Sequence, residues 1–503
     1  MKKWILRFGL FVILAVLLTG AFMNYELSKM YGGHTQLAQL KLEDKTPSYF
    51  ALTNVNVLTP SADKFISDQT VLVDQGTILS VGANVEFADD TPTIDGQGMF
   101  LVPGYTDSHV HLWESENDLL LYVANGVTQI REMNGSKAHL RWKAQIQAGR
   151  LGPDMFVVAP QLATFGFFEG LFVGWTQNKV IVRTETQVNK AVQSLKDDGY
   201  DAVKSSSFLD KDSYTALSNA AANISIPLVG HIPMAVGSEE FLNSNQIELA
   251  HVEELMKALN REFGEYTSRN ADSFLEFVRS RSDDVADRLL QEKKSVTSTL
   301  WLIDSFSRQK TNLGEVLRIS ELSYANPGIT EGTVITSRGM GWLPDVNIYR
   351  WPDNLEEARR QRSIVYWKTY AEAQHIVFES LLKKGVPIMA GTDANVPVTV
   401  PGFSLHDEMI TLNKAGMSPS QVLASVSSVP SKWMQTNTGE IRANFKANLV
   451  LLRDNPLEDI QATNSIEMVI VNGRILSRTD LDSILLAVQN ANDASRTVQL
   501  EYE

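Results

Sequence analysis

Two histidines one residue apart, His109 and His111, are the first residues of this chain whose spacing suggests chemistry. They end an apolar run, and alternate side chains of an extended strand share one face, so both imidazoles would point the same way. Two imidazoles on a rigid strand can hold one divalent metal ion. Because a His-x-His pair is common by chance, simple hydrogen bonding at a strand end stays open as the alternative.

Four further residues of ligand type follow along the chain, and each closes an apolar, strand-like run: Lys204, His231, His251 and Asp393. Either His231 or His251 alone fits a hydrogen-bonded core histidine, but the two on successive strands indicate a second metal position. Asp393, in Gly391-Thr-Asp, is expected to touch metal and to move a proton from water to a leaving group. A cap on the following turn is its alternative.

Lys204 ends the run Gly199-Tyr-Asp-Ala-Val-Lys. An ammonium at the inner end of a buried strand is costly unless it is paired or chemically altered. Carboxylation by CO2 would turn it into a carbamate, an anionic oxygen ligand able to bridge two metal ions. A salt bridge to a nearby carboxylate is the alternative, and the chemistry of lysine alone favours that alternative.

The composition excludes several classes of function. The chain has 503 residues, 44% of them hydrophobic, and a formal net charge of -14. Its length allows a large core, built as one big domain and a smaller one. The negative charge argues against nonspecific nucleic-acid binding, which requires a basic surface. Because the chain has no cysteine, disulfides, thiolate ligands, a cysteine nucleophile and lipid attachment through an N-terminal cysteine are excluded.

The N-terminal residues have the pattern of an export signal. Lys2, Lys3 and Arg7 precede an uncharged run over 8–23, as a positive region precedes an apolar one in signal peptides. That run is shorter than the roughly 20 residues of a membrane-crossing helix, and Ala21 offers a cleavage point. The pattern favours a cleaved signal peptide over an uncleaved inner-membrane anchor. Both predict a periplasmic or other extracytoplasmic body, with a membrane contact only through an uncleaved segment.

The middle region, 99–436, alternates strand-like and helix-like stretches. Eight apolar runs are predicted as strands, at 100–106, 127–132, 155–159, 202–206, 227–231, 248–252, 296–303 and 387–392. Helices are predicted over 186–198 and 214–222, and Ser418-Pro419 is a predicted N-cap followed by proline. This order indicates a (β/α)8 TIM barrel, whose site lies at the carboxyl ends of its strands. A doubly wound sheet is the alternative, but it does not explain the ligand types at those ends.

The remaining segments complete the predicted organisation. Residues 24–46 are a polar linker, and the β-rich segments 47–98 and 437–480 form a small composite β-sandwich domain. Helical insertions at 256–294 and 304–385 have the size of lids or oligomer contacts, so a homo-oligomer stays open. Residues 481–503 are a C-terminal tail.

These motifs resemble the metal-dependent amidohydrolase superfamily over residues 50–480. The resemblance is carried by Leu101-Val-Pro-Gly-Tyr-Thr-Asp-Ser-His-Val-His, Gly126-Val-Thr-Gln-Ile-Arg-Glu, Lys204, His231, His251, Gly391-Thr-Asp-Ala, Leu405-His-Asp-Glu-Met, Asn455-Pro-Leu-Glu-Asp-Ile and Val471-Asn-Gly-Arg. The branch that it resembles most is the imidazolonepropionase-related group, which includes Xaa-Pro dipeptidases with a lysine on strand four.

The resemblance implies two divalent metal ions, usually zinc, and a small-molecule substrate. One ion would be held by His109, His111 and Asp393 and the other by His231 and His251, with N-carboxylated Lys204 as the bridge. A bridging hydroxide would attack a polarised carbonyl while Asp393 relays the proton.

Three residues depart from the pattern of the family. Glu132 stands where the branch usually has Asp, Asp154 where relatives often have Arg, and Asn448 where Asp is common. None is an implied metal ligand, so hydrolysis stays expected and the substrate stays open. Arg131 is a candidate for binding a substrate carboxylate, with a structural ion pair as the alternative.

The sequence therefore predicts an exported hydrolase of a small amide-type bond, in a dipeptide such as Xaa-Pro or in an N-acyl amino acid. Opening of a cyclic amide or lactone is a second hypothesis, because both reactions pass through a tetrahedral intermediate. A catalytically silent, membrane-tethered binding protein of the same fold is a third, against which intact Lys204 and Asp393 argue.

Overall fold

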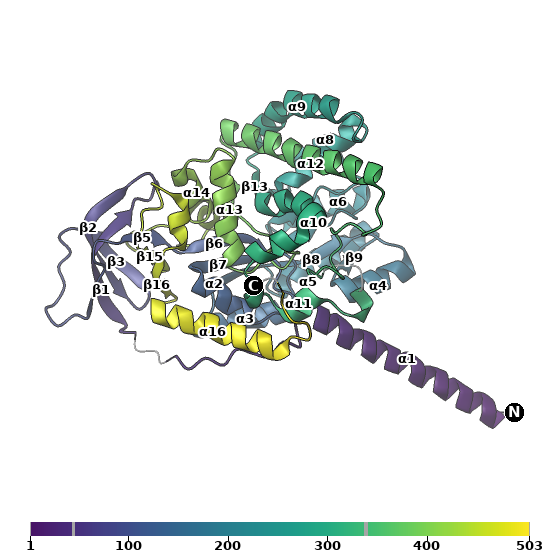
Figure 1. The fold of residues 1–503 in the computed structure, drawn as a ribbon, viewed down its shortest axis with the longest axis horizontal. Coiled ribbons are helices and arrows are strands. Elements are labelled where there is room, and N and C mark those ends of the chain that lie inside the picture. The colour runs from purple at the N-terminus through teal and green to yellow at the C-terminus, as the bar shows by residue number, and fades with distance from the viewer. Residues whose placement is uncertain (1, 43–45, 337–340, 502–503) are drawn as a thin grey trace.

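The computed structural model describes residues 2–42, 46–336 and 341–501. A β-sheet lies at one end of the molecule, a body of helices and parallel strands follows, and helix α1 (Lys2–Met30) projects from the opposite end (Figure 1). Residue 1 of the predicted signal, 43–45 of the linker, 337–340 of the second insertion and 502–503 of the tail lie outside the described residues.

Strands from both ends of the chain form the terminal sheet. They are β1 (Tyr49–Leu58), β2 (Phe65–Asp74), β3 (Thr77–Gly82), β4 (Thr93–Asp95), β5 (Phe100–Pro103), β15 (Leu449–Leu452), β16 (Ile466–Val471) and β17 (Arg474–Ser477). Antiparallel pairing of β5 with β15 joins the N-terminal set to the C-terminal set. Within the described residues these strands form one connected sheet, so the two separate layers expected of a sandwich are not observed.

The first predicted barrel strand, 100–106, is wrong as a single element because the chain changes sheets at Gly104. The Gly104 N–H donates to the carbonyl of Asn448 in the terminal sheet (2.8 Å). The next residues form β6 (Tyr105–Val110), which pairs with a strand of the body. A Cβ at Gly104 would clash with Thr128, so this close crossing requires glycine.

Parallel strands of the body form two arcs, one in the order β11-β10-β8-β7-β6 with β9 beside β8, and one in the order β12-β13-β14. Besides β6, they are β7 (Val127–Glu132), β8 (Asp154–Ala163), β9 (Val180–Ile181), β10 (Ala202–Ser205), β11 (Leu228–Gly230), β12 (Glu248–Leu249), β13 (Ser295–Thr297) and β14 (Ile388–Met389). At one seam the Ile247 N–H donates to the Leu228 carbonyl (3.0 Å). At the other, the Asp393 N–H donates to the His109 carbonyl (2.8 Å). Because all pairings within and between the arcs are parallel, the carboxyl ends of the strands gather at one end.

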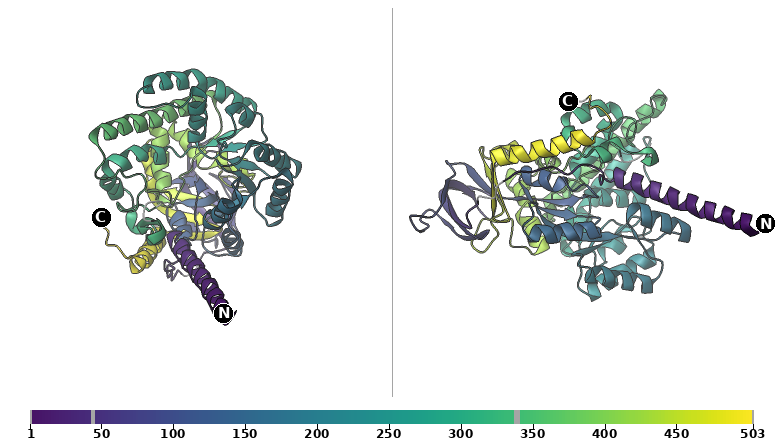
Figure 2. Two further views of the ribbon diagram at one scale, coloured as in Figure 1. Left: turned by 90° about the vertical axis from the view of Figure 1, so that its right-hand side faces the viewer. Right: turned by 90° about the horizontal axis from the view of Figure 1, so that it is seen from below.

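Helices surround these central strands, as the left view of Figure 2 shows. They are α2 (Asp118–Ala124), α3 (Lys137–Gln147), α4 (Phe167–Gln177), α5 (Glu185–Asp197), α6 (Lys211–Asn223), α7 (Ser238–Leu242), α8 (Val252–Phe263), α9 (Ala271–Gln291), α10 (Leu300–Ile319), α11 (Pro327–Glu331), α12 (Glu357–Lys384), α13 (Phe403–Lys414), α14 (Pro419–Ser425), α15 (Ser428–Met434) and α16 (Arg478–Ser495). The fold is a mixed α/β fold with a parallel sheet. The insertions supply α8 to α12, and much of the predicted tail is helix α16.

Most predicted elements of the body agree with the structure. The helices expected over 186–198 and 214–222 are confirmed as α5 and α6, and Ser418 caps α14 by accepting from the Gln421 N–H. The strand predicted over 296–303 is wrong beyond Thr297. There, Thr299 adopts a left-handed backbone (φ 58°) and the chain enters α10 at Leu300. Leu300, Leu302 and Ile303 are buried on this helix. A short apolar run cannot distinguish a buried helix from a buried strand.

Helix α1 runs past the candidate cleavage point at Ala21, so the first part of the predicted linker is helical. By length and composition, Trp4–Met30 is able to cross a membrane, and its most apolar window has mean hydropathy 2.4 with none of it buried. At its inner end Leu27 and Met30 are buried against the body. The right view of Figure 2 shows the rest of α1 extending away from the body.

Candidate metal centre

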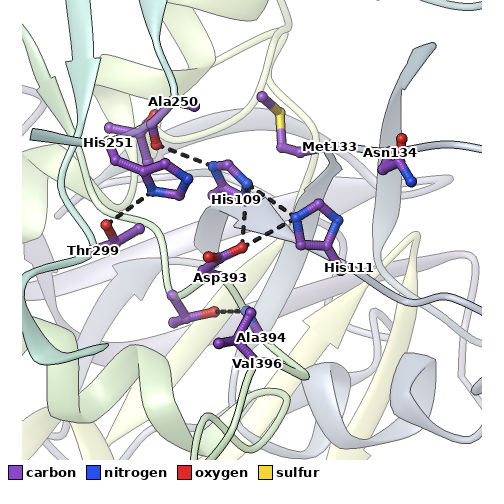
Figure 3. Close-up of polar contacts among 12 residues, drawn as sticks. His109, His111, Met133, Asn134, Ala250, His251, Thr299, Asp393, Ala394 and Val396 are labelled. Atoms are coloured by element: carbon purple, nitrogen blue, oxygen red, sulfur yellow. Dashed lines mark hydrogen bonds and ion pairs between the residues drawn. The ribbon is translucent and has the colours of Figure 1, made fainter. Parts of the chain in front are cut away.

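The end of β6 and the residues after β14 bring His109, His111 and Asp393 together across the seam between the first and last strands. His109 Nε2 lies 3.3 Å from His111 Nε2. Asp393 Oδ1 lies 3.4 Å from His109 Nε2 and 3.1 Å from His111 Nε2. Three atoms of ligand type therefore face one another at this end of the strands (Figure 3).

Gly391 and Asp107 keep β6 and the segment after β14 close enough for His109 and Asp393 to contact each other. A Cβ on Gly391 would lie 2.9 Å from the backbone nitrogen of His109 and 2.6 Å from Thr297 Cγ2, so the approach requires glycine. The buried Asp107 carboxylate accepts hydrogen bonds from Thr392 Oγ1 (2.7 Å) and from the His109 N–H (3.2 Å). These contacts fix the relative positions of His109 and Asp393.

His251 completes a compact group with two of these residues. The ligand atoms of His109, His251 and Asp393 all lie within 4.8 Å of one another. The imidazole of His251 stacks on that of His109, with ring centres 4.4 Å apart. His231 lies beside it, with its ring centre 5.6 Å from that of His251. The buried Nδ1 of His231 has no hydrogen-bond partner within the described part of the chain.

Lys204, at the end of β10, is fully buried next to this group. Across residues 46–336 and 341–501 its Nζ has no hydrogen-bond partner, so the salt bridge considered for it is not observed. Its side chain passes Gly230, where φ is +116° and a Cβ would lie 2.7 Å from Lys204 Cγ. Burial lowers the pKa of Lys204 to about 8, and its charge acts on all four candidate histidines.

Burial and neighbouring charges favour the metal-binding protonation states of four of the five titratable candidates other than Lys204. The exception is His111, where burial lowers the pKa but the contacts with Asp393 and Glu132 outweigh it and raise the pKa. Burial, assisted by the charge of Lys204, lowers the pKa values of His109 and His231 well below their usual range. Burial also lowers the pKa of His251 to about 4. For Asp393 burial acts in the opposite direction, but the hydrogen bond from His111 and the nearby charge of His251 outweigh it and lower the pKa to about 2. Neutral imidazole and ionised carboxylate are the forms that ligate metals.

Further residues, which the sequence analysis did not assign to the site, orient its side chains. Glu132, at the end of β7, accepts from the Leu112 N–H (2.6 Å) and lies 3.8 Å from His111 Nδ1. Thr299 Oγ1 lies 3.0 Å from His251 Nδ1, and the Ala250 carbonyl lies 3.1 Å from His109 Nδ1. The hydrogen-bond partners Thr299 and Ala250 fix the tautomer and direction of His251 and His109, whereas Glu132 is a charged neighbour of His111. Of Glu132, Ala250 and Thr299, only Glu132 stood out in the sequence, as an acidic residue at the end of a predicted strand.

Arg131, the candidate for a substrate carboxylate, forms the structural ion pair instead. Its side chain is fully buried, and Nη2 lies 3.3 Å from Glu248 Oε1. The guanidinium also lies over the Trp433 ring, 4.3 Å from the ring centre. Its burial among strands and apolar side chains favours the structural ion pair over the role in substrate binding.

Two of the three departures from the family pattern contact each other. Asn448 Nδ2 donates to Asp154 Oδ2 (3.2 Å), and Lys446 Nζ lies 2.8 Å from the same oxygen. Asp154 and Asn448, which depart from the family pattern, therefore contact each other where β8 meets the terminal sheet, away from the candidate ligands.

A cavity of about 450 Å³ lies beside the centre, between the inner end of α1, helix α4 and the loops after β6 and β7. Trp113, Asn134 and His139 line it. The Trp113 ring stacks on His111, with ring centres 6.4 Å apart. Because the side chains of His111 and Asp393 are 13% and 14% exposed, a small molecule at this end of the strands can reach them.

The residues fit a divalent metal centre. Imidazole nitrogens and a carboxylate oxygen are the usual donors to zinc, and here they converge in one compact group. Three buried nitrogens that have no hydrogen-bond partner among the described residues, Lys204 Nζ, His231 Nδ1 and His111 Nδ1, belong to or border the same group. Buried polar atoms are normally paired, so unpaired ones facing a donor group are expected where a cation belongs.

Comparisons with known proteins agree with the motifs. Residues 356–476 match the family model of the amidohydrolase family, which confirms the resemblance stated above. That match includes Asp393 and none of the other candidate ligands. An imidazolonepropionase from Idiomarina loihiensis is 43% identical over 67 residues, which are 12% of this chain and 16% of that protein. The chain spans less than a fifth of the length of the curated relatives that it matches.

Solved structures share the fold over a much larger part of the chain. Bottromycin amidohydrolase superposes with a TM-score of 0.68 and 21% identity, covering 89% of this chain and 91% of its own. A Xaa-Pro dipeptidase with methionine bound in its active site superposes with a TM-score of 0.59 and 16% identity, covering 86% of this chain and 100% of its own. At these identities the likeness concerns the fold.

Proposed function

We propose that this chain, which the family match and the shared fold connect with the amidohydrolases, is a binuclear-metal hydrolase of small amide-type C–N bonds. The convergence of His109, His111, His251 and Asp393 at one end of parallel strands carries the proposal. Because hydrogen bonds cross both seams between the two arcs, we infer that the strands act as one (β/α)8 barrel. Its carboxyl-terminal end is the active face.

The proposed ligands divide into two sets around a shared bridge. His109, His111 and Asp393 would hold one ion and His231 and His251 the other, and Lys204, once N-carboxylated, would supply an oxygen ligand between the two sets. The buried, unpartnered Nζ of Lys204 supports its modification, because an unpaired ammonium at this depth is costly. Carboxylation would exchange that ammonium for an anionic oxygen ligand among the imidazoles of the centre.

Asp393 is the proposed catalytic residue. When bound, the two ions supply Lewis-acid polarisation of the substrate carbonyl and a lowered pKa for water. Asp393, ionised and within reach of solvent, accepts the proton of the attacking water and passes it to the leaving nitrogen. Glu132 and Thr299 keep His111 and His251 directed at the centre throughout. The cavity wall at Trp113 and Asn134 receives the part of the substrate away from the scissile bond.

A substrate panel tests the reaction class. We expect turnover of dipeptides, Xaa-Pro among them, or of N-acyl amino acids, because their small amide groups fit a cavity of about 450 Å³. Lactones and cyclic amides belong in the panel, since turnover of these alone would assign the same centre to ring opening. Stoichiometric metal without turnover of any member would favour the silent binding protein instead.

Metal content tests the two-ion proposal. Protein purified without chelator should carry about two zinc equivalents per chain by elemental mass spectrometry, as two ligand sets require. Chelation should abolish activity, and zinc with bicarbonate should restore it. Lys204→Ala should lower the content to about one equivalent or less, because the bridge is lost.

Lys294→Ala is the matched control for that variant. Lys294 is also a buried lysine, but its Nζ donates to the backbone carbonyls of Ser244 and Gln246 and it is not among the proposed ligands. Its metal content per folded chain should equal that of the unmodified protein. Equal zinc in Lys204→Ala and Lys294→Ala would contradict the bridging role.

We propose further that α1 holds an exported body at the membrane. Leu27 and Met30 dock the inner end of α1 onto the body, and this favours an uncleaved anchor over a removed signal peptide. Lys2, Lys3 and Arg7 precede the apolar segment, and flanking cations of this kind stay on the cytoplasmic side. The body then lies on the opposite side of the membrane.

A further inference from the structure

Helix α4 exposes a continuous apolar face. Exposed fractions are 65% for Phe167, 83% for Phe168, 60% for Leu171, 55% for Phe172 and 46% for Trp175. The opposite face of the helix, with Gly170, Val173 and Thr176, is buried against the body. Soluble proteins seldom leave contiguous large apolar side chains on a surface without a partner. The composition of α4 therefore indicates that something apolar covers it.

The exposed face of α4 lies next to the inner end of α1. Trp175 Nε1 donates to Asn24 Oδ1 of α1 (2.9 Å). Just beyond α1, the Tyr31 hydroxyl donates to the Thr176 carbonyl of α4 (2.7 Å). In Figure 1 both helices lie at the end of the molecule opposite the terminal sheet. Their relative position is thus held by side-chain contacts at the level of residues 24–31.

The length of α1 sets that level relative to a membrane. From Trp4 to Phe22 a helix rises roughly 27 Å, close to the ~30 Å thickness of the hydrocarbon core. Asn24, which contacts Trp175, then falls at the outer boundary between acyl chains and headgroups. Tyr25 and Trp175 lie at the same level, where aromatic residues with a polar atom are enriched.

We infer that α4 lies in the outer surface of the membrane that α1 crosses, with its phenylalanine-rich face among the lipid acyl chains. This inference rests on the proposed anchoring by α1. A lipid surface is favoured over a protein partner because the apolar face of α4 is continuous with an anchor that already requires lipid. Within 164–178 the sole charged residue is Glu169, so contact depends on apolar burial rather than on attraction to anionic headgroups.

The position of α4 has a consequence for the cavity. Asn24 and Leu27 of α1 and Trp175 of α4 line the cavity together with Trp113, whose ring stacks on His111. The membrane-facing helices are thus also walls of the space beside the metal centre. The cavity then lies at the bilayer surface.

Site-directed spin labelling of the full chain in phosphatidylethanolamine–phosphatidylglycerol vesicles tests the inference without depending on activity. Because the chain has no native cysteine, Phe168→Cys and Phe172→Cys can each carry one nitroxide. Leu14→Cys in α1 (55% exposed) is the reference for lipid, and Leu486→Cys in α16 (57% exposed) is the reference for water. All four positions are on the surface, so the substitutions should leave the fold intact.

Labels at 168 and 172 should collide readily with oxygen and be protected from a water-soluble nickel chelate, as at 14 and unlike at 486. If the labels at 168 and 172 behave like the water reference at 486 while the label at 14 behaves as in lipid, the membrane anchor stands and the inference about α4 is overturned. If 14 also matches 486, both are overturned. A fluorescent label at the same cysteines, quenched by nitroxide-bearing lipids, provides a second measurement: strong quenching at 168 and 172 is expected, and quenching as weak as at 486 would overturn the inference.

Discussion

Asp393→Asn is expected to lower kcat by about 10²- to 10⁴-fold, the usual contribution of a positioned proton-transfer group. Asparagine keeps the side-chain shape and an oxygen donor, but it cannot accept the proton of the attacking water. The backbone should tolerate the change, because Asp393 has a left-handed φ of 58° and asparagine adopts that region readily. The measurement is kcat on the best substrate of the panel, together with zinc per chain.

The zinc content separates two reasons for a loss of activity. If zinc stays near that of the unmodified protein while kcat falls, Asp393 acts in proton transfer. If both fall together, Asp393 is mainly a ligand. Asp353→Asn is the control, because Asp353 is an exposed aspartate paired with Arg350 at the surface. Unchanged kcat in Asp393→Asn would refute the proposed mechanism.

Arg131→Met is expected to lower the free energy of unfolding by about 3–5 kcal/mol, the cost of leaving one partner of a buried ion pair unpaired. Glu248 is fully buried, and without the guanidinium its carboxylate would keep a hydrogen bond from Thr297 Oγ1 (2.5 Å) but lose its charge partner. Methionine is chosen because the Arg131 site is lined by Met133 and Met389. Thermal or urea unfolding of the two proteins measures the difference.

A double variant and a surface control show whether the loss of stability in Arg131→Met comes from the broken ion pair. Arg131→Met with Glu248→Leu should recover much of the stability, because an apolar pair of similar volume can replace a buried ion pair. Arg279→Met removes an exposed pair with Glu372 (3.0 Å) and should cost about 1 kcal/mol or less. If Arg131→Met were as stable as Arg279→Met while losing activity, a role of Arg131 in substrate binding would return.

The sequence by itself determined most strands of the body and the residue types at their ends. It did not determine the first predicted strand, which changes sheets at Gly104, or the end of 296–303, which is helical. Val127–Glu132 coincides with the predicted run, and α5 and α6 lie where periodicity placed them. Such elements are readable because apolar spacing and caps act within a few residues. Since parallel strands end on the same side, ligand types at the ends of β6, β10, β11, β12 and β14 were expected to meet. The contact of His109 with Asp393 agrees with that reasoning.

Only the tertiary structure decided which side chains face the centre and which are used elsewhere. Arg131 pairs with Glu248 inside the strands, and Thr299 reaches His251 from the chain after β13. The packing of α4 against the end of α1 was equally invisible in the sequence, where both are simply apolar. These contacts join residues far apart along the chain, and no local pattern encodes their partners. They arise from the meeting of whole elements, whereas strand ends and helix caps are set by neighbours in the sequence.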